Sequence, residues 1–67
     1  MNKAKYPEVT IRLVGEDGNV FSLISRVARA LRQSGHADAE VQFEREAFAA
    51  NSYDEVLRLA ISYVKVL

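Results

Sequence analysis

The chain has 67 residues, of which 49% are hydrophobic, and its nine basic and nine acidic side chains give a formal net charge of zero. It contains no Cys and a single His, which excludes disulfides, thiolate metal sites, Cys nucleophiles and a metal centre built from His alone. We therefore expect one domain, residues 1–67, that folds on its packed core without a cofactor or a metal. Because domains below about 70–80 residues often add an oligomeric interface, self-association is one expected way to bury more apolar surface.

The zero net charge hides an unequal distribution along the chain. Residues 1–35 carry six basic and three acidic side chains, whereas residues 36–67 carry three basic and six acidic ones. The two halves are expected to neutralise each other in one fold; the alternative is a basic face that meets a polyanion. The first residues lack the apolar segment of a secretory signal, and no run approaches the roughly 18 apolar residues of a membrane span. The sequence thus predicts a cytoplasmic protein without membrane contact.

The first predicted element is a strand at residues 8–14, after a loose leader at residues 1–6. Pro7 suits the position just before a strand, where its missing N–H matters least. Val9, Ile11 and Leu13 alternate with residues that face the other way, which is the period of a strand with one face on a core. The Gly-Glu-Asp-Gly sequence at residues 15–18 predicts a turn, because glycine adopts positive φ at little cost.

The second predicted element is an amphipathic helix that follows this turn. Asn19 is a good N-cap. Apolar residues then recur at helical spacing, namely Val20, Leu23, Ile24, Val27, Ala30 and Leu31. Ser34 and Gly35 end the helix, with Gly35 at the position after the C-cap.

A second helix is predicted at residues 39–50, with Asp38 as its N-cap. The segment Glu40–Glu44 also alternates, so a short strand is the competing interpretation. We favour the helix because most residues from Glu44 to Ala50 are good helix formers and no turn residue separates them from Phe43.

The last part of the chain predicts a third helix and a closing strand. Ser52 and Glu55 form a capping box, in which each side chain bonds the other residue's backbone N–H. The residues expected to face inward are Val56, Leu57, Ala60 and Ile61. The alternating end, Tyr63–Val66, is expected to pair with Val9–Val14, because a lone strand would leave its backbone groups unpaired. The predicted fold is α+β, in the order β-α-α-α-β.

Four motifs give the chain a resemblance to a known group of proteins. They are D-G-N-x-F at residues 17–21, R-A-L-R-x-x-G at 29–35, F-x-x-x-S-Y-D-E-x-L at 48–57 and Y-V-x-V at 63–66. Over residues 6–66 the chain resembles a family of small uncharacterised bacterial and phage proteins. The resemblance implies a helix at residues 38–50 but no activity, ligand or active site. One departure is Asn51, where that family would have a small residue or Gly; Asn also tolerates the left-handed conformation.

Two parts of the chain are candidates for an anion site. The pair Gly15 and Gly18 precedes a helix N-terminus, but Glu16 and Asp17 would repel a phosphate, and neither a P-loop nor a dinucleotide fingerprint is present. Four arginines could follow a phosphate backbone, namely Arg12, Arg26, Arg29 and Arg32. Against this, nucleic-acid-binding domains usually carry a net basic charge, and a solvated helix face paired with acids is the simpler interpretation.

Catalytic and metal-binding patterns are weaker still. His36 lies just past a helix C-terminus, near Ser34, without the spacing of a nucleophile elbow or an orienting acid. Glu40, Glu44 and Glu46 are best interpreted as a charged, solvated face, because no second helix supplies matching ligands. We therefore expect no enzymatic activity.

The aromatic residues carry the functional hypothesis. Most of them are expected in the core or at its rim, but if Phe43 and Phe48 cannot both reach one core, one of them marks an exposed interface. We expect a non-enzymatic protein-interaction module, with a homodimer as one form, that binds an unknown protein or itself through Phe43, Phe48 and Tyr53. The alternative is a weak nucleic-acid-binding protein that uses the four arginines.

Overall fold

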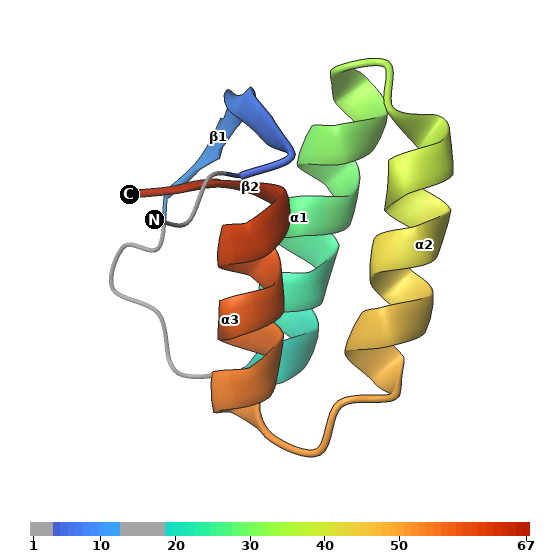
Figure 1. Cartoon of the computed structure of the whole chain (residues 1–67). Helices are drawn as coiled ribbons and strands as arrows, with labels where there is room; N and C mark the ends of the chain where they lie inside the picture. The colour runs from blue at the N-terminus through green and yellow to red at the C-terminus, as the bar shows by residue number, and fades with distance from the viewer. Residues whose placement is uncertain (1–3, 13–18) are drawn as a thin grey trace.

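The computed structural model describes residues 4–12 and 19–67, and five elements lie in these ranges. They are β1 (Tyr6–Ile11), α1 (Val20–Gln33), α2 (Ala37–Phe48), α3 (Tyr53–Tyr63) and β2 (Val64–Val66). The helices stand side by side, and the two strands lie together at one end of α1 and α3 (Figure 1). The predicted α+β fold in the order β-α-α-α-β is confirmed.

The two strands pair in parallel, because three helices carry the chain from one end of the sheet back to the other. Tyr6 lies opposite Val64 and Ile11 opposite Val66, with an irregularity in β1 between Tyr6 and Thr10. The backbone continues this pairing at both ends, where Lys5 N–H donates to the Ser62 carbonyl at 3.0 Å and Leu67 N–H donates to the Ile11 carbonyl at 2.9 Å.

The strand boundaries correct the sequence analysis in two places. β1 begins at Tyr6 rather than at residue 8, so Lys5 and Tyr6 belong to the fold and not to a loose leader. β2 begins at Val64, because Tyr63 is the last residue of α3. The inward positions Val9 and Ile11 are buried as predicted. Leu13, Val14 and the predicted turn at residues 15–18 lie outside the described residues.

Both ends of α1 are set by the residues that the sequence indicated. The Asn19 Oδ1 accepts hydrogen bonds from the Phe21 N–H at 2.8 Å and the Ser22 N–H at 3.4 Å. At the other end Gly35 has a φ of +85°, its N–H donates to the Arg32 carbonyl and the next N–H donates to Leu31. This is a Schellman motif, which requires the left-handed conformation that glycine adopts without strain.

The start of α2 differs from the prediction because of this motif. Its N-cap is His36, whose carbonyl accepts from the Glu40 N–H at 3.0 Å, and no side chain caps the helix. Asp38 is therefore not the N-cap; it lies in the first turn, where its charge complements the helix dipole. The Schellman motif leaves His36 positioned to begin the next helix at once, so α2 starts at Ala37. It runs through residues 40–44, so the competing strand interpretation is wrong.

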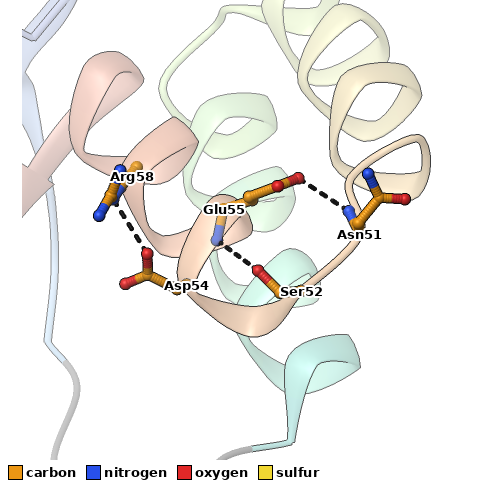
Figure 2. Close-up of polar contacts among 5 residues, drawn as sticks. All are labelled: Asn51, Ser52, Asp54, Glu55 and Arg58. Atoms are coloured by element: carbon orange, nitrogen blue, oxygen red, sulfur yellow. Dashed lines mark hydrogen bonds and ion pairs between the residues drawn. The ribbon is translucent and has the colours of Figure 1, made fainter.

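A capping arrangement close to the predicted one begins α3 (Figure 2). The Ser52 Oγ accepts from the Glu55 N–H at 3.2 Å, as the capping box requires. The Glu55 carboxylate accepts from the Asn51 N–H at 2.9 Å, one residue earlier than expected. Asn51 does not adopt the left-handed conformation. Asp54 and Arg58 form an ion pair one turn apart, at 3.0 Å.

The inward face of α3 also needs one correction. Val56, Ala60 and Tyr63 are buried, and Leu57 packs at the edge of the core. Ile61 was expected inside but its exposed fraction is 40%. The buried residues follow one stripe at spacings of four and three, and Ile61 lies next to that stripe rather than on it.

All five elements contribute to one hydrophobic core. Its largest fully buried side chains are Tyr63, Phe43, Leu23, Leu31, Val27, Val56 and Val64. The rings of Phe43 and Tyr63 meet edge to face, with centroids 5.3 Å apart. The Tyr63 hydroxyl donates to Glu46 at 2.9 Å, so its polar end is satisfied. Among the described residues, no helix has the length and apolar character needed to cross a membrane.

Candidate functional site

The structure separates the two phenylalanines of α2. Phe43 has no exposed surface, because it shares the inward stripe of α2 with Ala39 and Ala47 and its ring packs on Tyr63. The prediction that Phe43 belongs to a binding surface is therefore wrong. Phe48, five residues further along the helix, points away from the core and exposes 63% of its surface.

A second exposed ring lies beside Phe48. Phe21, near the start of α1, is also 63% exposed, and the two ring centroids are 6.3 Å apart. The antiparallel packing of α1 and α2 brings the first turn of one helix next to the last turn of the other. The sequence carried a signal for Phe21, since it falls outside the helical spacing of Val20, Leu23 and Ile24, but it was not assigned to the surface.

Both rings border a hollow of about 250 Å³. Its other lining residues come from α1, from the end of α2, from the connection between α2 and α3 and from the start of α3, namely Val20, Ile24, Ala47, Ala50, Asn51, Ser52, Tyr53 and Val56. Tyr53, which was predicted to bind a partner, is half-buried here. We call Phe21, Phe48 and Tyr53 the aromatic patch. It has an apolar floor and a polar edge at Asn51 and Ser52, as the centre and rim of protein interfaces do.

Three of the four arginines meet at a different hollow. Arg12, Arg26 and Arg29 line a groove of about 690 Å³, together with Ser22, Ser25 and Gln33. Ile11, Asn19, Phe21 and Ala30 also line this hollow, which we call the arginine groove. The Arg26 Nη1 donates to the backbone carbonyl of Arg12 at 3.2 Å, which holds the end of β1 to α1.

The fourth arginine does not belong to this groove. Arg32 faces α2 and pairs with Glu40, with 3.5 Å between Nη1 and Oε2. This is the pairing between a basic helix and the acids of the next helix that the sequence favoured. Because of this ion pair, Arg32 does not extend the arginine groove.

His36 connects β1 to the turn between α1 and α2. Its Nε2 lies 2.9 Å from the Glu8 carboxylate, and its ring lies 4.2 Å from that of Tyr6. The pKa of Glu8 is lowered, first by a hydrogen bond from its own backbone N–H and then by the His36 contact. These contacts stabilise the fold, and they bring no nucleophile to the imidazole.

Two of the three glutamates of α2, Glu40 and Glu46, contact different parts of the fold. Glu40 pairs with Arg32, and Glu46 accepts a hydrogen bond from Tyr63 on another side of the helix. In residues 4–12 and 19–67, no group of three His, Asp or Glu side chains could hold a metal ion.

Comparison with known proteins adds no relative. The chain matches no protein-family model, and searches of curated proteins and of solved structures give no significant match. The resemblance to a family of small bacterial and phage proteins therefore stays a prediction.

Proposed function

We propose that the protein is a non-enzymatic protein-interaction module whose binding surface is centred on the aromatic patch. The observation that carries the proposal is the Phe21–Phe48 pair, in which two large apolar rings are each 63% exposed and lie side by side at a hollow. Clustered apolar surface of this kind marks interaction sites, and aromatic residues are enriched among those that dominate binding energy.

The size of the molecule supports an interface larger than the patch itself. Burying a Phe side chain is worth about 1.5–3 kcal/mol, so two rings alone give weak binding once the cost of association is subtracted. The whole chain exposes 4552 Å², and one side of a standard interface, about 800 Å², would cover about a sixth of it. A stable partner must therefore contact neighbouring surfaces as well as the patch.

The proposal is tested with Phe21→Ser and Phe48→Ser, which change exposed side chains and should leave the circular dichroism spectrum unchanged. We expect both variants to lose binding, whether the partner is another protein or a second copy. Sedimentation over a wide concentration range detects self-association. If the wild type is monomeric, capture of proteins from an extract of the host, compared between wild type and variants, detects a different partner.

Ile61→Ser is the matched control, because Ile61 is also exposed but lies on α3 outside the patch. It should bind as the wild type does. The proposal fails if the two Phe variants behave like the control in both sedimentation and capture. Since disulfide-free chains are typical of reducing compartments and this chain has no Cys, we place this interaction in the cytoplasm.

A second candidate function rests on the arginine groove. Three arginines on one groove are the arrangement expected of a site for a phosphate backbone, and they support weak nucleic-acid binding without Arg32. We rank this candidate lower because the net charge of the chain is zero. Titration of labelled single-stranded DNA and RNA at low salt tests it, and the absence of binding there would exclude it.

A further inference from the structure

The aromatic patch and the arginine groove share one residue. Phe21 lines both hollows, with Phe48 and Tyr53 on one side of it and Arg26 and Arg29 on the other. A ligand that covers Phe21 therefore meets an apolar hollow in one direction and guanidinium groups in the other. This adjacency matters because a partner must extend beyond the patch.

The described residues that line the arginine groove are basic or uncharged. None of the described residues that line it carries a carboxylate; its polar groups are guanidiniums, two serine hydroxyls and the amides of Asn19 and Gln33. Arg29 forms no ion pair within the part of the chain that the structure describes, in contrast to Arg32. Guanidinium groups in such a setting favour carboxylates, which they can bind with two parallel hydrogen bonds.

Two backbone N–H groups at the start of α1 already have a hydrogen-bond acceptor, so they do not attract the same anion. Asn19 caps the helix, and its side chain accepts from the N–H groups of Phe21 and Ser22. Any attraction for acidic groups in this region thus comes from the arginine side chains.

We infer that the partner of the aromatic patch is an acidic peptide segment with an apolar anchor. The anchor, a large side chain such as Leu or Met, enters the hollow between Phe21, Phe48 and Tyr53. Carboxylates of the same segment lie at the arginine groove, where one of them binds Arg29. This inference rests on the proposed function and adds the chemistry of the partner.

The spacing of the two hollows limits the shape of that segment. Phe21 and Arg29 are eight residues apart on α1, which corresponds to about 12 Å along the helix axis. An extended peptide covers this distance in about four residues. We therefore expect Asp or Glu about three to five residues from the anchor.

The same surface is less suited to a nucleic acid. The hollow at the patch is lined mostly by apolar residues, which do not bind the phosphates that a nucleic acid would place there. A partner that unites an apolar side chain with carboxylates satisfies both hollows at once.

The experiment is a selection of random 12-residue peptides displayed on phage against the wild-type protein, followed by affinity measurements on synthetic peptides. We expect the selected peptides to combine a large apolar residue with at least two Asp or Glu at the stated spacing. Phe48→Ser should abolish their binding. Arg29→Gln should weaken it by about two- to fivefold at low salt, the range of a single exposed ion pair. Affinity should fall as salt is raised.

Arg58→Gln is the matched control, because it removes the same charge from an exposed arginine of α3 that lies outside both hollows. It should leave peptide affinity unchanged. Selected peptides that need Phe48 but show neither acidic residues nor a response to Arg29→Gln would overturn the inference and leave the proposed function standing. If no selected peptide depends on Phe48, the inference falls. The proposed function falls with it only if Phe48→Ser also behaves like its control in sedimentation and in capture from the host extract.

Two other outcomes identify a different occupant. A dimer that Phe48→Ser dissociates, with no acidic peptide selected, would assign the surface to a second copy of this chain. Tighter binding of a 20-nucleotide poly-dT strand than of every selected peptide, lost in Arg29→Gln, would assign the groove to nucleic acid. Either result would overturn the inference.

Discussion

At the scale of single residues, Tyr63 shows how a polar group is kept at the end of a hydrophobic core. Its burial, together with the hydrogen bond that it donates to Glu46, raises its pKa from 10.0 to about 12. In the unfolded chain this hydroxyl ionises near its ordinary pKa, so between pH 10 and 12 the unfolded state loses a proton that the folded state keeps. The free energy of unfolding should therefore be unaffected by this residue below pH 10 and should fall as the pH rises to 12.

Urea denaturation at pH 8 and at pH 11, with and without Tyr63→Phe, measures this effect. At pH 8 the variant should lose about 1 kcal/mol, the usual net value of one hydrogen bond, because Glu46 is exposed and regains water. Between pH 8 and 11 the variant should lose less stability than the wild type does. An equal loss in both proteins would show that Tyr63 titrates normally.

Glu8 gives a prediction at the acidic end of the pH range. Its pKa lies below 4.5, so its interactions stabilise the fold above that value and are lost as the pH falls through the folded pKa. Carboxyl ¹³C resonances should place the Glu8 pKa below 4.5 in the wild type. Because the largest cause is its own backbone N–H, His36→Gln should raise this pKa only in part. A wild-type pKa at or above 4.5 would contradict the hydrogen bonds described here.

At the scale of the elements, Gly35 fixes the connection between α1 and α2. Its φ of +85° suits glycine, and a Cβ added there would have no heavy atom within 4 Å. The cost of Gly35→Ala should thus be conformational alone, about 1–2 kcal/mol, and Gly35→Asn should cost less because Asn tolerates this conformation better. Urea midpoints of the three proteins measure both effects. Equal destabilisation by Ala and Asn would point to a steric cause instead.

The elements also show what the sequence could and could not indicate. Asn19, Gly35 and Ser52 each bond to atoms within a few residues, so local chemistry alone was enough to place them. The start of α2 was misplaced because the Schellman motif makes His36 both the end of one helix and the N-cap of the next. The true start of β1 depends on pairing with β2, more than fifty residues away, which no local pattern contains.

At the scale of the whole molecule, the sequence predicted Phe48 and Tyr53 of the aromatic patch, but it missed Phe21 and wrongly included Phe43. The two faces of α2 explain why. This helix has two apolar stripes, one with Ala39, Phe43 and Ala47 and the other with Val41 and Phe48. Either stripe could face a core when the helix is considered alone. Only packing against both α1 and α3 decides that Phe43 is inside and Phe48 outside, and the same packing brings Phe21 to Phe48.

This assignment makes a prediction about stability that separates core from surface. Phe43→Ala leaves a cavity in the centre of the molecule and should cost about 3–5 kcal/mol. A core of this size supplies a net stability of about 3–5 kcal/mol, so the variant should be largely unfolded at 25 °C. Phe48→Ala and Phe21→Ala should change the free energy of unfolding by about 0.5 kcal/mol or less, as exposed positions usually do. Circular dichroism in a urea series measures all three variants. A folded Phe43→Ala protein beside an unfolded Phe48→Ala protein would reverse the roles of the two rings, and with them the location of the interaction surface.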